Sequence, residues 1–151
     1  MPARSTTSEA VTVHVVVPPS STPFGGTAAL IPVVIEAENF DEGGEGIAYH
    51  DLTTGNAGGQ YRQTDVDIAT TSDAGGGYAL GYVAAGEWLK YSVSVAAAGS
   101  YTLEARVASA GRGGNVPCRG RRRRRDRSAR GARTTGGWQT LANDQPRHES
   151  R

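Results

Sequence analysis

The sequence IPVVIEAENFDEGGEGIAYHD, residues 31–51, decides the fold that we predict for this chain. The apolar residues Val33, Ile35 and Ala37 recur at a period of two, which predicts a β-strand with one apolar face. Glu36 and Glu38 then share the opposite face, where two carboxylates repel each other unless a cation joins them. An acidic, glycine-rich loop follows at residues 41–46 and can wrap around a ligand or an ion. We interpret this stretch as the first strand and first loop of a β-sandwich.

The rest of the chain predicts further short strands separated by glycine-rich turns. In one of them Val66 and Ile68 are expected to point inward, and no segment shows a helical period. Short alternating strands at this spacing are typical of a β-sandwich with jelly-roll topology. The fold class that we predict is therefore all-β, and the resemblance described below implies that it is incomplete at its C-terminal end. The segments with this alternation are residues 65–68, 78–83, 88–95 and 101–107.

Length and composition limit the class of protein. A chain of 151 residues with 37% hydrophobic residues and 21 glycines has room for one domain with a tail. No run approaches the roughly 18 apolar residues of a membrane span, so no membrane partner is expected. Residues 11–17, VTVHVVV, are mostly apolar, but His14 and the preceding Glu9 argue against a signal peptide. The single cysteine, Cys118, excludes a disulfide within the chain.

Charge is distributed very unevenly along the chain. Residues 116–133 hold nine Arg and one Asp, whereas the remainder has 7 basic and 14 acidic residues. An acidic β-domain therefore carries one strongly basic segment. Because nine like charges with few apolar neighbours cannot offset the entropy of ordering, we expect this segment to be disordered.

These observations predict five regions. The first two are a remnant of a preceding domain, or a disordered segment, and then a linker rich in Pro, Ser, Thr and Gly. A partial β-sandwich is followed by the Arg-rich segment and by a residual motif with a disordered tail. In this order the five regions span residues 1–17 (remnant or disordered), 18–30 (linker), 31–115 (sandwich), 116–134 (Arg-rich segment) and 135–151 (motif and tail).

Six ordered motifs resemble the family 6 carbohydrate-binding modules, which are β-sandwich domains of secreted polysaccharide-degrading enzymes. They lie between Thr22 and about Gly114, with an isolated one at residues 135–140. The resemblance implies a non-catalytic module that anchors a covalently attached glycoside hydrolase to a plant or algal-type polysaccharide of the xylan or β-glucan class. It also implies secretion. The motifs are TPFGGT with IP, IEAENFDEGGEGIAYHD, GGQYRQTDVDI, SDAGGGYALGYVAAGEWLKYSV, AAAGSYTLEARVASAG and TGGWQT.

The resemblance also implies particular site residues. Tyr61 and Trp138 match the two aromatic rings that flank a sugar, and an aromatic face suits the C–H groups of a pyranose. Glu36 and Glu38 match the ligands of a structural calcium ion, which prefers hard oxygen donors. We assign Trp88 and Tyr91 to the core or sheet face. Four further residues could bond sugar hydroxyls, and the sequence does not choose among them: Glu42, Glu45, His50 and Asp51.

The resemblance is interrupted after Asn115 by VPCRGRRRRRDRSARGAR. If each arginine has a CGN codon, reading from the second base of the Val116 codon permits FHVEVDGVDVTG over residues 116–127. That string alternates around an Asp-Gly turn, a strong hairpin signal, and it resembles the family at this place. The same shift at Leu141 permits TGGWQTW. Our hypothesis is that the arginine run is a strand segment read in the wrong frame and that the module is truncated.

Two other functions compete with polysaccharide binding. Residues 119–133 could bind nucleic acid through their dense positive charge, but the absence of aromatic interleaving and of a helical pattern favours non-specific binding only. A fragment of a glycoside hydrolase could use Glu36, Glu42 or Glu45 as acid and base. Two carboxylates on one strand match an ion site better than an acid and base that flank a substrate.

Overall fold

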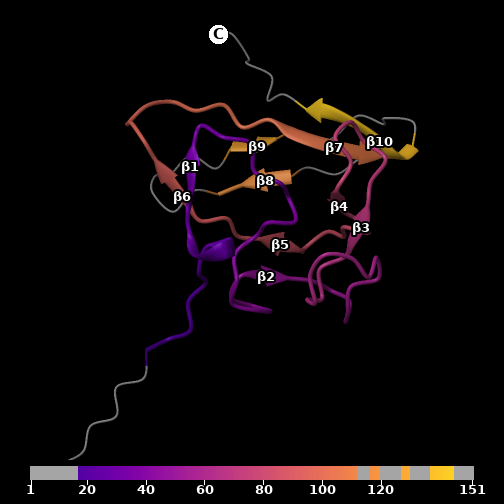
Figure 1. Cartoon of the computed structure of the whole chain (residues 1–151), viewed down its shortest axis with the longest axis horizontal. Helices are drawn as coiled ribbons and strands as arrows, with labels where there is room; N and C mark the ends of the chain where they lie inside the picture. The colour runs from indigo at the N-terminus through magenta and orange to yellow at the C-terminus, as the bar shows by residue number, and fades with distance from the viewer. Residues whose placement is uncertain (1–16, 112–115, 120–126, 130–136, 145–151) are drawn as a thin grey trace, which may run out of the picture.

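A computed structural model describes residues 17–111, 116–119, 127–129 and 137–144, and in the last two ranges it describes the backbone alone. The fold is all-β, as the alternation predicted (Figure 1). The one helix of the described residues is the 3₁₀ turn η1, and none of their helices is long and apolar enough to cross a membrane. The elements in chain order are η1 (Phe24–Gly26), β1 (Ala29–Ile31), β2 (Tyr49–His50), β3 (Ile68–Thr70), β4 (Tyr78–Leu80), β5 (Trp88–Leu89), β6 (Val93–Val95), β7 (Ala105–Ser109), β8 (Val116–Cys118), β9 (Arg127–Ala129) and β10 (Gly137–Asp144).

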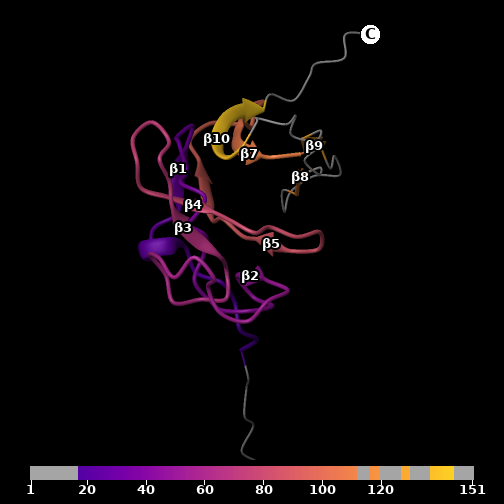
Figure 2. The ribbon, with the colours of Figure 1, turned by 90° about the vertical axis from the view of Figure 1, so that its right-hand side faces the viewer.

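The strands described form five two-stranded sheets. β1 pairs with β6 in parallel, and the other four pairs are antiparallel: β2 with β5, β3 with β4, β7 with β10, and β8 with β9. The β7–β10 pair is the longest, with a register shift between Gly137 and Leu141. In Figure 2 the β8–β9 hairpin lies apart from β1, β3 and β4. The chain is thus all-β, as the strand spacing predicted, and this arrangement is consistent with a β-sandwich.

The predicted opening strand at residues 33–37 is wrong. The chain pairs earlier, in β1, and leaves the ladder after Ile31 because Pro32 has no N–H to donate. A turn follows, closed by a 3.0 Å hydrogen bond from the Asn39 amide to the Glu36 carbonyl. The turn rotates Glu36 outward and buries Glu38, so the two carboxylates do not share a solvent-facing side of a strand.

The alternating segment 88–95 divides into two strands instead of one. Asp41 causes the interruption, because its amide donates to the Lys90 carbonyl and its Oδ1 accepts a 2.7 Å bond from the Ser92 amide. Backbone groups at 90–92 therefore bond to a loop from elsewhere in the chain. The pattern identified the extended backbone correctly but did not reveal its partners.

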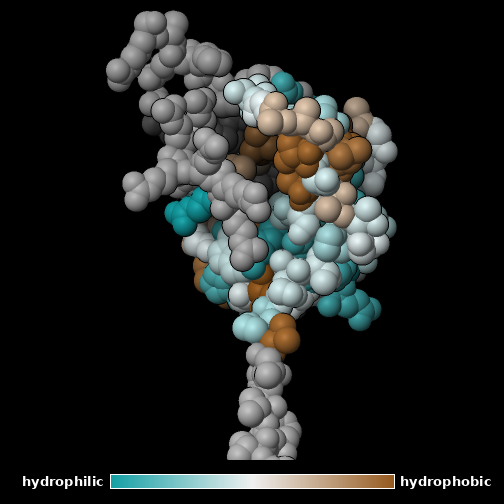
Figure 3. All heavy atoms as spheres, turned by 90° about the vertical axis from the view of Figure 1, so that its left-hand side faces the viewer, coloured by the Kyte–Doolittle hydropathy of each residue, from teal (hydrophilic) through white to brown (hydrophobic). Residues whose placement is uncertain are grey.

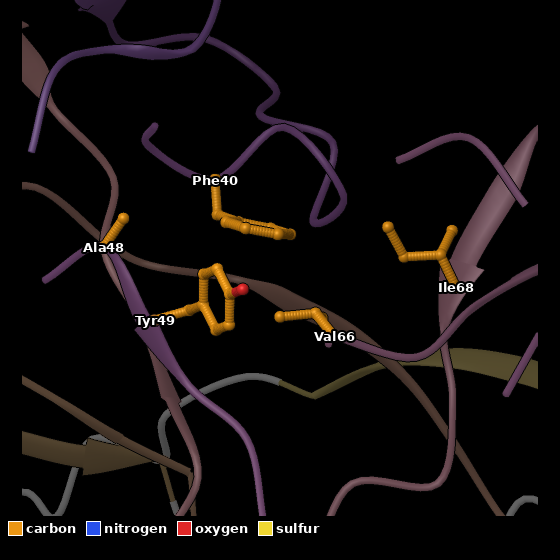
Figure 4. Close-up of a cluster of buried hydrophobic side chains, with 5 residues drawn as sticks. All are labelled: Phe40, Ala48, Tyr49, Val66 and Ile68. Atoms are coloured by element: carbon orange, nitrogen blue, oxygen red, sulfur yellow. The ribbon is translucent and has the colours of Figure 1, made fainter. Parts of the chain in front are cut away.

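The core is small and centred on one edge-to-face aromatic pair. The Phe40 and Tyr49 rings have centroids 5.5 Å apart and an angle of 73° between their planes (Figure 4). Val66 and Ile68 pack with them and are 5% and 0% exposed, which confirms the predicted inward positions of these two side chains. Ala48 completes the buried cluster. The core thus joins the loop of the opening stretch to the segment that enters β3.

Many apolar side chains lie outside this core. Figure 3 faces the side of the molecule where β1 and β6 lie in Figure 1, and it shows a contiguous apolar patch. In this strand pair Leu30, Val93 and Val95 are exposed. Tyr101 and Leu103 are exposed too, although the alternation of residues 101–107 predicted that they point inward. Their segment precedes β7, which begins at Ala105.

The five-region division of the chain remains a prediction, and two structural details bear on it. Within the segment expected to be a linker, Thr22 exchanges backbone hydrogen bonds with Glu42, and β1 pairs with β6. Within the Arg-rich segment expected to be disordered, β8 and β9 form an antiparallel hairpin. The predictions for residues 1–16, for the tail at 145–151 and for most of the arginine run lie outside the described residues.

Candidate functional site

Asn56 organises the loop that leads from β2 to β3. Its side-chain Nδ2 donates to the carbonyls of Gln60 and Arg62 at 2.8 and 3.0 Å. Its Oδ1 accepts hydrogen bonds from the amides of Gly59 and Ile68, at 2.9 and 2.8 Å. One amide side chain therefore satisfies four backbone groups, which fixes the loop without a ladder of strands.

Two aspartates accept hydrogen bonds from backbone amides of the same loop. Asp65 Oδ1 accepts the Gly55 amide at 2.8 Å, and Asp67 Oδ1 accepts the Ala57 amide at 2.6 Å. Asp67 is buried. Both carboxylates are thus engaged by backbone donors, so their role here is to hold the loop in shape.

The loop lines an open hollow of about 430 Å³, and Tyr82 belongs to the same lining. Tyr82 is 72% exposed and follows β4 in a left-handed backbone conformation, with φ of 51°. A tyrosine rarely adopts a positive φ, and such strain collects at functional positions. Its ring is a free aromatic surface beside hydroxyl and amide groups. The lining consists of Thr53, Thr54, Gly55, Asn56, Ala57, Asp67 and Tyr82.

Sequence reasoning missed Tyr82 because it counted this residue in the alternating segment 78–83. β4 ends at Leu80, and the Gly81 amide donates to the Asp67 carbonyl at 2.9 Å, so the chain turns before Tyr82. The signal that could have found it is an aromatic residue in a stretch between Gly81 and Gly86. Glycine-bounded stretches favour loops, and loops carry binding residues more often than strands do.

Tyr61, the predicted sugar platform, lies outside this hollow. It is 46% exposed and also has a positive φ, of 62°. Its hydroxyl donates to Asn39 Oδ1 at 2.6 Å, and its ring centroid lies 4.7 Å from that of Tyr78. The Phe24 ring centroid lies 6.1 Å away, so the Tyr61 side chain is accessible to solvent but has three neighbours that hold it. The other predicted platform, Trp138, lies in β10, and its side chain is outside the described residues.

Arg62, the neighbour of Tyr61, points inward. Its side chain is 8% exposed and its guanidinium carbon lies 5.1 Å from the Phe24 ring centroid. Nη1 donates to the carbonyls of Glu38 and Phe40, and Nη2 forms a 2.7 Å ion pair with Glu42. This side chain connects the opening loop to the loop that carries Tyr61.

Glu36 and Glu38, the predicted calcium ligands, lie close enough to interact electrostatically. Glu38 is 6% exposed, and this burial raises the pKa of its carboxyl, with a smaller contribution from the charge of Glu36. Burial, together with the negative charge of Glu38, raises the pKa of the Tyr91 phenol, whose hydroxyl donates to the Ala37 carbonyl at 2.7 Å. A cation would offset this local excess of negative charge. The described residues contain no group of three or more acidic, His or Cys side chains arranged to hold a metal.

The remaining carboxylates of the opening loop have partners of their own. Glu45 accepts hydrogen bonds from His50 Nδ1 at 2.5 Å and from the Asp51 amide at 3.0 Å, and the bond to His50 is the main cause of its lowered pKa. Glu42 pairs with Arg62. An acid catalyst of glycoside cleavage needs a raised pKa, so Glu45 does not match that role.

Comparison with known proteins agrees with the predicted family. No curated protein matches the sequence significantly. The family model described as carbohydrate binding module (family 6) matches residues 58–146, more than half of the chain. The matched region includes Tyr61, Tyr82 and Trp138 and continues through the Arg-rich segment, while Glu36 and Glu38 precede it. The chain belongs to the family 6 carbohydrate-binding modules, whose role is to bind carbohydrate without catalysing a reaction on it.

Proposed function

We propose that this module binds a neutral polysaccharide of the xylan or β-glucan class through the Tyr82 hollow. The observation that carries the proposal is the exposed, conformationally strained Tyr82 ring beside the hollow. A pyranose presents polarised C–H groups on its face, and an aromatic ring contacts them while excluding water. The Thr54 hydroxyl in the lining suits a hydroxyl of the same sugar, and Thr53 Oγ1, which donates to Asp51 Oδ1 at 2.8 Å, can still accept a hydrogen bond.

Tyr61 and Trp138 remain the aromatic positions that the family resemblance gives. Tyr61 is accessible, but its ring packs against Tyr78 and its hydroxyl is bonded to Asn39, so fewer of its atoms are free for a ligand. The Tyr82 side chain makes no hydrogen bond and no ring contact within the described part of the chain, and it is 72% exposed. We therefore give Tyr82 the main contact and Tyr61 the secondary one.

Affinity electrophoresis of the full chain in gels that contain xylan, β-glucan or agarose tests this proposal. We expect retardation in the xylan or the β-glucan gel, abolished by Tyr82→Ala and retained in Tyr101→Ala, a matched control at a tyrosine 44% exposed. Tyr82→Gly is a second variant that suits the positive φ and so preserves the fold. A wild-type chain that migrates freely in every gel would overturn the proposal, as would full retardation of both Tyr82 variants.

The biological role that we propose is attachment. A module that holds a covalently linked polysaccharide-degrading enzyme on its substrate raises the effective concentration of that enzyme without any chemistry of its own. Such an enzyme acts on extracellular polymers, so we place the parent protein outside the cell. Fusing the chain to a xylanase or glucanase and comparing hydrolysis of insoluble and soluble substrate would test this role, with a gain expected only on the insoluble one.

We also propose that Glu36 and Glu38 hold a structural calcium ion. The two side chains fit the ion in charge and donor type, since one is buried and both carry oxygen ligands. Two carboxylates do not complete the six to eight ligands that calcium takes, so backbone carbonyls and water would supply the others. The proposed ion would stabilise the turn that joins β1 to the core.

Finally, we propose that the arginine run results from a shift of reading frame. The supporting observation is the alternating, turn-containing string that the shifted codons permit across residues 116–127. Sequencing the DNA over codons 114–145 tests it directly. Arginine codons in an intact frame that cannot yield the alternating string would refute it.

A further inference from the structure

A second hollow adjoins the Tyr82 hollow at the Asn56 loop. Its volume is about 480 Å³, and it shares Gly55 and Asn56 with the first. The turn at these two residues is therefore a common wall, and a ligand lying across it would contact both hollows. The lining of the second hollow consists of Tyr49, Gly55, Asn56, Gly59, Arg62, Gln63, Thr64 and Asp65.

Two consecutive side chains in this lining have unused hydrogen-bonding capacity. Thr64 Oγ1 is buried and has no hydrogen-bond partner among the described residues. Gln63 is exposed, and its side-chain amide makes no hydrogen bond within the same part of the chain. A buried hydroxyl without a partner is costly, and a hydrogen bond to a ligand or a water molecule would remove that cost.

The other polar groups of this lining are already engaged. Asp65 accepts the Gly55 amide, Asn56 bonds four backbone groups, and Arg62 is held by carbonyls and by Glu42. Hydrogen bonds hold these groups in place, and Arg62 is ion-paired with Glu42. The free donors and acceptors of the hollow are thus the neutral groups of Gln63 and Thr64, which suit the hydroxyl groups of a sugar.

We infer that the two hollows are adjacent subsites for one saccharide chain. The inference rests on the proposed function: Tyr82 takes the face of one sugar ring, and Gln63 and Thr64 take the hydroxyls of the next. The Thr64 hydroxyl is covered in the structure, so it reaches the sugar by rotation about the Cα–Cβ bond to another staggered rotamer. The ligand is accordingly a neutral chain of at least two sugars, and a single sugar fills half of the site.

Isothermal titration calorimetry on the full chain tests this inference, with glucose, cellobiose and cellotriose and with xylose, xylobiose and xylotriose as probes. Affinity in the preferred series should rise from one sugar to two. Thr64→Val and Gln63→Ala should each weaken binding of the disaccharide about three- to tenfold, the value of one or two hydrogen bonds, and leave monosaccharide binding unchanged. Thr64→Val keeps the side-chain shape and removes an unsatisfied hydroxyl, so the fold should be preserved.

Gln60→Ala is the matched control, since this exposed glutamine lies on the same loop outside the lining. Equal affinities for one and two sugars, or variants at 63 and 64 that behave like the control, overturn the two-subsite inference. If Tyr82→Ala still abolishes binding in that case, the proposed function stands. A wild-type chain that binds none of the six probes and no polysaccharide overturns both.

Discussion

The guanidinium carbon of Arg62 lies 3.8 Å from the centroid of the Phe40 ring, and Nη1 of the same group donates to the Phe40 carbonyl at 2.5 Å. Arg62 thus stacks on a core ring while satisfying the backbone of the residue that carries it. A planar guanidinium can do both, whereas a lysine ammonium cannot. The loop that carries Tyr61 is held against the core through this contact.

Arg62→Lys is therefore expected to destabilise the fold by about 2–4 kcal/mol, because buried carbonyls lose donors and the stacking is lost. Urea denaturation followed by tryptophan fluorescence measures this change. Arg106→Lys is the control. Because Arg106 is exposed, this variant should lose clearly less stability than Arg62→Lys. Equal losses in the two variants would contradict the role of Arg62 as a buried clamp.

Gly58 and Gly59 should respond to alanine for different reasons. A Cβ on Gly58 would lie 2.0 Å from the carbonyl oxygen of Ile68, a backbone atom that cannot move aside, so Gly58→Ala should cost about 3 kcal/mol or more. Gly59 has open space but a φ of 63°, so alanine there should cost about 1–2 kcal/mol. Thermal unfolding of the two variants should rank them in this order, and the reverse order would show that the loop lies differently against β3.

Asp73 and Arg106 should make stability depend on acid pH. Two hydrogen bonds from the guanidinium hold the pKa of Asp73 at about 2, below its usual value of 3.8. The carboxylate is ionised more readily in the folded state, so its contribution is present above pH 3.8 and is lost as pH falls through 2. The stability difference between wild type and Asp73→Asn should be constant at neutral pH and shrink over this window. High salt should reduce the difference, because the pair is exposed. A difference that does not change with pH would contradict the assignment.

Calcium should raise the thermal stability of the module if Glu36 and Glu38 bind it. At one hundred times its dissociation constant the ion would add about 2.7 kcal/mol, and chelation with EDTA would remove this gain. Glu36→Gln should abolish the shift without disturbing the core, since Glu36 is exposed, whereas Glu104→Gln should retain it. Melting curves with and without calcium give the answer. Identical wild-type curves would exclude a calcium site of useful affinity.

Local pattern was sufficient for the class of fold and for part of the core. Alternation between glycine-rich turns predicted an all-β chain, and it predicted that Val66 and Ile68 face inward, where both are buried. Such predictions succeed because a side-chain period of two is a local property of extended backbone. The family followed from motif order, which the match to residues 58–146 supports.

The positions of the site residues depended on contacts between distant segments. No local pattern shows that Asp41 bonds to Ser92 and divides a strand, or that Arg62 turns inward onto Phe40. The alternation also could not distinguish Tyr82, which the chain exposes after β4, from the neighbouring residues of the same segment.

The sequence by itself thus determined the fold class, the family and the uneven charge of this protein, because periodicity, motif order and composition can all be read along the chain. Only the tertiary structure decided that Glu38 is buried beside an exposed Glu36 and that Tyr82 borders a hollow next to Asn56. The physical reason is that burial and hydrogen bonding at these positions depend on partners from other parts of the chain.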